Sequence, residues 1–127
     1  MVVTKLLFED ESYAIRGAVF EVYREIGCGF LEAVYQECLE TELAERNIPF
    51  EAQKELPLTY KGRPLTQIYK ADLVCYGQIV LELKATKTIT AEHRAQTINY
   101  LKAANIRLGL LINFGSHPKA TIERLIL

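Results

Sequence analysis

This sequence of 127 residues lacks most of the features that would place it in a specialised class of protein. It has three cysteines, at positions 28, 38 and 75, an odd number with no C-x-x-C spacing. A disulfide framework and a structural zinc site are therefore not expected, and we predict free thiols in a reducing compartment. No apolar run approaches the ~20 residues that a membrane span needs. The first residues, MVVTKLLFEDES, lack the architecture of a signal peptide, so we expect a cytoplasmic protein without a membrane partner.

Neither sign of charge dominates the chain. The formal net charge is -1, which gives no global electrostatic reason to bind nucleic acid, and any such binding would need a local basic patch. The 24% of charged residues and the 50% of hydrophobic residues argue against disorder and are enough for a proper core. Repeats, linkers and low-complexity segments are also missing. A single domain over residues 1–127 is predicted.

The hydrophobic periodicity predicts three helices and a set of strands. Helices are expected at about 10–26, 30–46 and 90–105, and strands at about 50–60, in a hairpin over 67–85, at 107–114 and near the C-terminus. One side of the second helix should carry Glu32, Tyr35, Gln36, Leu39 and Leu43. The order α-α-β-β-β-α-β-(β) predicts the α/β class, with a mixed sheet of four strands, or slightly more, flanked by helices.

The hairpin contains the most informative pattern. Two apolar runs flank a turn at Tyr76-Gly77, and three charged residues interrupt them: Asp72, Glu82 and Lys84. A two-residue loop would place Asp72 and Glu82 on opposite faces. A three-residue loop pairs Asp72 with Glu82 and sorts the side chains into one apolar face and one face with all three charges. We therefore predict the second register.

Two carboxylates on a rigid strand pair suit a hard cation such as Mg²⁺ or Mn²⁺. Such an ion polarises a phosphoryl oxygen and lowers the pKa of a bound water. Lys84 lies on the same face as Glu82, where its ammonium group would act on the attacking water or on the charge of the transition state. A surface strand with an ordinary ion pair explains the same spacing.

The third helix presents a polar strip beside this hairpin. Gln96 and Tyr100 are four residues apart, and His93 lies one turn before them. If the helix packs beside the hairpin, Gln96 and Tyr100 would border the carboxylates. A solvated helix face is the simpler interpretation.

The other candidates are a glutamate and a basic cluster. Glu32 belongs to the inward stripe of the second helix and would add a third carboxylate to the metal site, although the helix dipole alone explains a glutamate in a first turn. We predict contacts to nucleic acid from Tyr35 and from a cluster near the hairpin. This cluster, which is equally explained as a solvated face, consists of Lys84, Lys87, His93 and Arg94.

Together these residues resemble the PD-(D/E)XK nuclease superfamily. Asp72 and the E-x-K of Glu82-Leu-Lys84 match its central motif, and Gln96-Thr-Ile-Asn-Tyr100 resembles the Q-x-x-x-Y helix of RecB-like members. More closely, the chain is similar to the small GxxExxY proteins of that superfamily, through Gly29-Phe-Leu-Glu32-Ala-Val-Tyr35 and the blocks IVLELKA, HRAQTINYLK and LGLLINFG in the same order. The resemblance covers about residues 10–126.

The resemblance implies a restriction-endonuclease-like core that binds Mg²⁺ or Mn²⁺ and cleaves phosphodiesters. Asp72, Glu82 and Glu32 would be the metal ligands, and Lys84 would act on the water or the transition state. Gln96 and Tyr100 would orient the substrate phosphate or support the lysine. Lys70 and Ala71 stand before Asp72, where arginine and proline are frequent in the family.

The sequence leads to one principal hypothesis and two alternatives. The first is a metal-dependent nuclease whose partner is nucleic acid, DNA rather than RNA. An exposed strand at the edge of the sheet would also allow a homodimer. The second is a catalytically silent module that binds nucleic acid or regulates, and the third is a subunit that contacts other proteins. The intact set of candidate residues argues against a decayed site.

Overall fold

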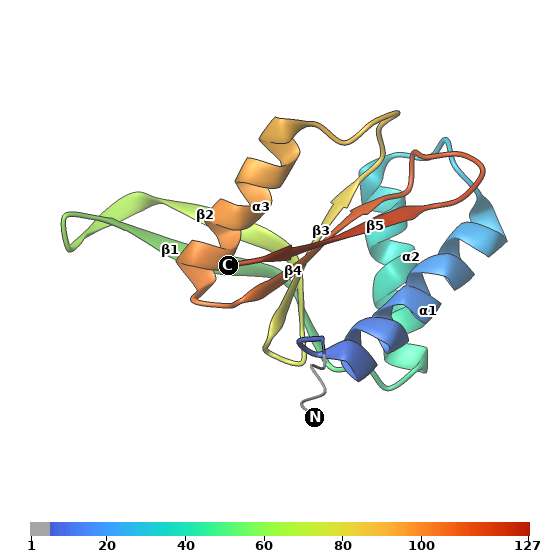
Figure 1. The fold of residues 1–127 in the computed structure, drawn as a ribbon, viewed down its shortest axis with the longest axis horizontal. Helices are drawn as coiled ribbons and strands as arrows, with labels where there is room; N and C mark the ends of the chain where they lie inside the picture. Colours follow the sequence, from blue (N-terminus) through green and yellow to red (C-terminus); the bar gives the residue numbers. More distant parts are fainter. Residues whose placement is uncertain (1–5) are drawn as a thin grey trace, which may run out of the picture.

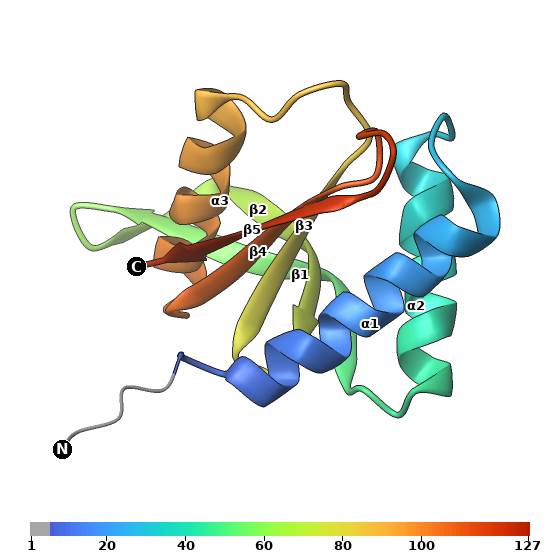
Figure 2. The same cartoon turned by 45° about the vertical axis from the view of Figure 1, so that its right-hand side comes forward.

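A computed structural model describes residues 6–127 of the chain (Figure 1). Five strands form one mixed sheet in the order β1-β2-β3-β4-β5, and three helices pack against it. Figures 1 and 2 show α1 and α2 together on one side of the sheet and α3 on the other. The α/β fold class predicted from the sequence is confirmed, with the C-terminal strand as the fifth strand. The predicted absence of a signal peptide rests partly on residues 1–5, which lie outside the described residues.

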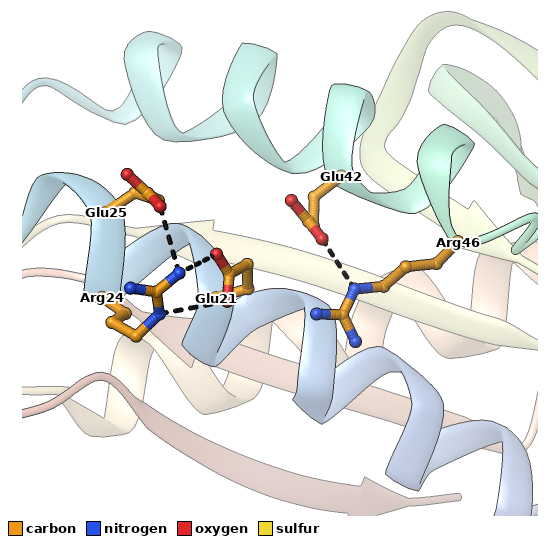
Figure 3. A network of polar contacts seen from close by, with 5 residues as sticks. All are labelled: Glu21, Arg24, Glu25, Glu42 and Arg46. Atoms are coloured by element: carbon orange, nitrogen blue, oxygen red, sulfur yellow. Dashed lines mark hydrogen bonds and ion pairs between the residues drawn. The ribbon is translucent and has the colours of Figure 1, made fainter.

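The first two helices pack against each other and cover one face of the sheet. α1 spans Glu9–Ile26 and α2 spans Glu32–Glu45. The apolar stripe of α1 lies in the core, as its helical spacing predicts. Near the end of α2, Arg46 lies close to α1 and binds Glu42, while Arg24 of α1 binds Glu21 and Glu25 (Figure 3). The outer side of this helix pair is rich in carboxylates.

A long hairpin begins the sheet. β1 (Phe50–Tyr60) and β2 (Arg63–Cys75) are antiparallel and joined by a tight turn at Lys61 and Gly62, both of which have positive φ. Glycine adopts this conformation without strain, as a two-residue hairpin turn requires. β2 starts four residues earlier than the 67–85 hairpin predicts. The register shifts between Pro57 and Thr59, in agreement with the irregular edge strand that Pro57 indicates.

The hairpin from β2 to β3 (Ile79–Lys84) has the predicted register. Leu73 pairs with Leu81, Val74 with Val80 and Cys75 with Ile79 across a three-residue loop. The leucines, the cysteine and the isoleucine pack under α1 and α2, and the two valines pack under α3. The apolar side chains therefore sort between two faces, as the alternation along a strand requires.

The second half of the chain completes the sheet by a helical crossover. α3 (Ala91–Ala104) begins after Thr90, whose side chain accepts a hydrogen bond from the backbone N–H of His93 and caps the helix. β4 (Leu108–Asn113) then runs parallel to β3, and β5 (Thr121–Ile126) pairs antiparallel with β4. Both faces of β3 and β4 are covered, which explains their nearly continuous apolar sequences.

Two groups of buried side chains lie on the two faces of this sheet. The larger one joins the sheet to α1 and α2, and the smaller one joins it to α3 through Tyr100 and Leu101. The three cysteines are free thiols, as predicted. Over residues 6–127, no helix combines the length and the apolar character needed to cross a membrane.

Candidate metal-dependent active site

The candidate site lies where the β2–β3 pair separates from β1. Gln53 of β1 and Asp72 of β2 stand opposite each other but are not paired in the sheet, although the residue pairs on either side keep the same register. Gln53 has a φ of 50°, in the left-handed region. Ala71 packs with the group under α3, whereas Leu73, two residues later, packs with the group under α1 and α2. The strand thus changes face at Asp72, a local irregularity of the kind that redirects a side chain.

Asp72 and Glu82 are held together by backbone hydrogen bonds that cross between their strands. The backbone N–H of Asp72 donates to Oε1 of Glu82 over 3.0 Å, and the backbone N–H of Leu83 donates to Oδ2 of Asp72 over 2.8 Å. Gln36 of α2 also donates from Nε2 to the backbone carbonyl of Asp72 over 3.0 Å. Each carboxyl is therefore fixed by the strand that carries the other.

Burial and mutual repulsion act on the ionisation of these two groups. Only 3% of Glu82 is exposed, and burial, followed by the charge of Asp72, raises the pKa of Glu82 to about 9. Burial also raises the pKa of Asp72, which the Leu83 N–H and the nearby Lys84 ammonium oppose. Two adjacent carboxyls, one buried and one partly buried, cannot both ionise at a low cost in free energy without a compensating positive charge. The pair is therefore a position where a cation would be stabilised.

Lys84 and the third helix complete one side of the pair. Lys84 ends β3, and its Nζ donates to Oε1 of Gln96 over 3.1 Å. Tyr100 is buried one turn further along α3, and its ring lies 4.7 Å from that of Tyr69. Burial, and then the charges of Glu82 and Asp72, raise the pKa of Tyr100 to about 12, so its hydroxyl stays protonated at neutral pH. The structure thus brings together five of the predicted residues: Asp72, Glu82, Lys84, Gln96 and Tyr100.

A cavity of about 300 Å³ opens beside Asp72 on the side of α2. Its lining comes from three elements besides Asp72 of β2: Glu32, Ala33 and Gln36 of α2, Gln53 of β1, and Leu83 of β3. Partial burial raises the pKa of Glu32, which Lys84 opposes. The sequence pattern did not identify Gln53. The sequence gives little indication of this residue, because no local pattern predicts a left-handed backbone conformation within a strand.

The position of Glu32 differs from the prediction. Glu32 is exposed at the start of α2 and does not face the core. Between residues 6 and 127, no three His, Cys, Asp or Glu side chains come close enough to ligate one metal ion, so the predicted site of three carboxylates is not formed. The reason is that the inward stripe of α2 begins one turn later, at Tyr35.

Tyr35 is the second correction. Its side chain is fully buried and stacks on Phe114 with ring centroids 4.4 Å apart, so the prediction that it contacts nucleic acid is wrong. The hydroxyl donates to the carbonyl of Gly27 and accepts from the N–H of Phe30. Together with Gly29, whose φ of 106° favours glycine, Tyr35 fixes the connection between α1 and α2.

The predicted basic cluster lies beside α3. Lys87 is exposed in the loop before the helix, and Nδ1 of His93 accepts a hydrogen bond from the N–H of Thr90 as part of the helix cap. Arg94 forms a 2.6 Å ion pair with Glu123 of β5. His93 and Arg94 thus have structural contacts of their own, which are compatible with further contacts to a phosphate.

The donor set fits a hard divalent cation. Mg²⁺ is commonly held by one or two carboxylates together with waters and substrate phosphates, rather than by a complete protein cage. Asp72 and Glu82 supply two fixed carboxyls, and the adjoining cavity leaves space for further ligands. A third protein carboxylate, which Glu32 was predicted to add, is therefore not needed to hold such an ion.

Comparisons with known proteins identify the fold and the superfamily of the chain. No curated protein matched the chain by sequence. A crystal structure of the protein SSO0001 superposes on 94% of the chain, with a TM-score of 0.59 and 18% sequence identity. This similarity shows the fold alone, and the chain spans 59% of the length of that structure. The model of the PD-(D/E)XK nuclease superfamily matches residues 9–125. The chain belongs to the PD-(D/E)XK nuclease superfamily.

Proposed function

We propose that this protein is a nuclease that hydrolyses phosphodiester bonds in DNA and depends on Mg²⁺ or Mn²⁺. The observation that carries the proposal is the pair of carboxyls formed by the buried Glu82 and the partly buried Asp72, fixed across two strands with the Lys84–Gln96 contact beside it. Membership of a superfamily of nucleases supports the same reaction. The motif of Gly29, Glu32 and Tyr35 supports placement among its GxxExxY members.

The residues have separate roles in this proposal. Asp72 and Glu82 would hold the metal, which when bound would supply polarisation of the phosphoryl group and a lower pKa of a bound water. Lys84 stabilises negative charge that develops on the phosphoryl oxygens, and Gln96 positions its ammonium group. Glu32, at the cavity, is proposed to hold waters of the site rather than to bind the metal directly.

The test is cleavage of linear and supercoiled DNA with Mn²⁺, Mg²⁺ or a chelator. Asp72→Asn and Lys84→Met should each lower the rate by at least about 100-fold, because each removes a charge that acts on the transition state. The matched controls are Glu37→Gln on the exposed side of α2 and Lys119→Met in an exposed loop, which should cleave like the wild type.

Two results would contradict the proposal. One is cleavage that resists the chelator or survives in both Asp72→Asn and Lys84→Met, which would point to a contaminating nuclease. The other is binding of DNA without cleavage under either metal, which would favour a silent binding module.

A further inference from the structure

Within residues 6–127, the distal half of the β1–β2 hairpin has no third strand beside it. β2 is paired with β3 only over Leu73–Cys75, so beyond Leu56 and Tyr69 the two strands pair only with each other. Figures 1 and 2 show this part projecting beyond the sheet on the side of α3, away from α1 and α2. It exposes large apolar side chains: Tyr60 is 64% exposed, Leu65 44% and Ile68 41%. A two-stranded ribbon in water is only marginally stable alone, which suggests that it has a ligand.

The charges of this hairpin point to a polyanion. Residues 56–71 contain Lys61, Arg63 and Lys70 but no acidic residue. The adjoining cavity of about 550 Å³, between the hairpin and α3, also has no carboxylate in its lining, which includes Tyr69, Asn99 and Lys102. Lys61 lies over the exposed ring of Tyr60, 5.5 Å from its centroid. Basic groups next to an exposed aromatic ring are typical of surfaces that bind nucleic acid.

The rest of the chain strengthens this contrast. Residues 9–55, which include α1 and α2, contain twelve acidic and four basic residues. Residues 56–127 contain four acidic and ten basic residues, and two of those four are the site carboxyls Asp72 and Glu82. The net charge of -1 therefore conceals an acidic N-terminal part, with ten of its twelve carboxylates on α1 and α2, and a basic C-terminal part that includes the distal half of the hairpin.

The dimensions of the hairpin favour duplex DNA. Arg63 lies nine residues before Asp72 on the same strand, which at about 3.3 Å per residue places the tip about 30 Å from the carboxyl pair. This is roughly the length of nine base-pair steps. The major groove of B-form DNA admits a two-stranded β-ribbon, whereas the major groove of duplex RNA is too narrow for side chains to enter.

We propose that the β1–β2 hairpin is a DNA-binding arm that follows the duplex away from the cleavage site, with Lys61 and Arg63 on phosphates. This inference rests on the proposed function and adds the surface that holds the substrate. In this arrangement the start of α2, with Glu32, borders the cleavage site, and α1 lies on the side of the molecule away from the arm.

The test measures binding apart from cleavage. Asp72→Asn protein is titrated with a blunt, labelled duplex two to three helical turns long, in a chelator, and anisotropy gives the affinity at several salt concentrations. Adding Lys61→Gln and Arg63→Gln should lower the affinity at least tenfold and reduce the slope of log K against log salt by about 1.8, because two phosphate contacts are lost. Arg16→Gln with Arg24→Gln removes the same charge from α1 and should change neither quantity.

The outcomes separate this inference from the proposed function. An unchanged salt slope in the hairpin variant overturns the arm even if the wild type cleaves DNA. A reduced slope supports the arm even if the wild type cleaves nothing, a result that removes only the catalytic proposal. Equal affinity for duplex RNA or single-stranded DNA overturns the assignment to a B-form groove. Another outcome is a dimer that Leu65→Ser and Ile68→Ser dissociate, while the charge variant keeps the salt slope of the wild type. That result would assign the hairpin to contacts with a second copy of the chain and would overturn the proposal of a DNA-binding arm.

Discussion

Burial determines the chemistry of individual side chains in this protein more than their type does. Glu82 and Glu32 are both glutamates of the candidate site, yet one is buried against Asp72 and the other is exposed at the cavity. The three cysteines show the same contrast, since Cys28 is exposed and Cys75 is buried.

Glu82→Gln should leave the metal-free protein as stable as the wild type, within a few tenths of a kcal/mol, or more stable. The amide keeps an oxygen for the Asp72 N–H and removes an ionisable group from a buried position. The wild type should gain about 2.7 kcal/mol of stability when Mn²⁺ is present at 100 times its Kd, and Glu82→Gln should lose most of this gain. Thermal unfolding with and without Mn²⁺, with Glu37→Gln as the control, measures both effects. An equal Mn²⁺ effect in wild type and Glu82→Gln would exclude Glu82 as a ligand.

Cys28 should react with a thiol reagent at pH 8 in the native protein, and Cys75 should not. Burial raises the pKa of the Cys75 thiol to about 12, so almost none of it is the reactive thiolate at that pH, and the reagent cannot reach it. Mass spectrometry after brief labelling locates the modified residue, and labelling in denaturant provides the control in which all three cysteines react. Native labelling of Cys75 before Cys28 would contradict the packing of β2.

At the scale of elements, the connections determine how the site is held. The loop after β3 leads from Lys84 to α3, and it is anchored by Asn113 at the end of β4. Only 2% of Asn113 is exposed. Its Oδ1 accepts from the N–H groups of Thr86 and Gly115, over 3.1 and 2.9 Å, and its Nδ2 donates to the carbonyl of Thr86 over 2.8 Å. This single side chain thus closes the loop that begins at Lys84.

Asn113→Ala should therefore destabilise the protein by about 2–3 kcal/mol, because three backbone groups lose their partner at about 1 kcal/mol each. Chemical denaturation should show this as a lower midpoint with an unchanged m-value. Asn99→Ala on the exposed side of α3 is the matched control and should change stability by no more than about 0.5 kcal/mol. A loss below about 1 kcal/mol in Asn113→Ala would mean that water replaces these hydrogen bonds.

At the scale of the whole molecule, the sheet joins two buried groups of side chains that lie on opposite faces. Leu73 and Val74 are neighbours in β2 but belong to different groups. The same alternation occurs at Val80 and Leu81 in β3. Neither group can be exposed without disturbing the strands that also support the other.

We therefore propose that residues 1–127 form one domain that unfolds in a single transition. Calorimetry should give equal calorimetric and van't Hoff enthalpies, of about 90 kcal/mol near 60 °C for a chain of this length. Far-ultraviolet circular dichroism and tyrosine fluorescence should report the same midpoint. Two separate transitions would show that the α3 side folds independently of α1 and α2.

The sequence alone determined the order of the elements and the register of the β2–β3 hairpin. These features depend on local causes: the period of apolar residues, the Thr90 cap, and the fact that only the register with a three-residue loop places Asp72 on the same face as Glu82. Asp72, Glu82 and Lys84 could be grouped for the same reason. The superfamily, too, was accessible from the sequence, through the order of its motifs.

Only the tertiary structure decided the features that depend on contacts between distant elements. Tyr35 lies in the core because Phe114, at the end of β4, provides a ring to stack on, and Glu32 is exposed because the stripe of α2 meets the sheet one turn later. The left-handed conformation of Gln53 and the change of face at Asp72 occur where β2 pairs with β1 along one edge and begins to pair with β3 along the other. The distance between the acidic helices and the basic tip of the hairpin is likewise a property of the folded chain, because the hairpin projects away from α1 and α2.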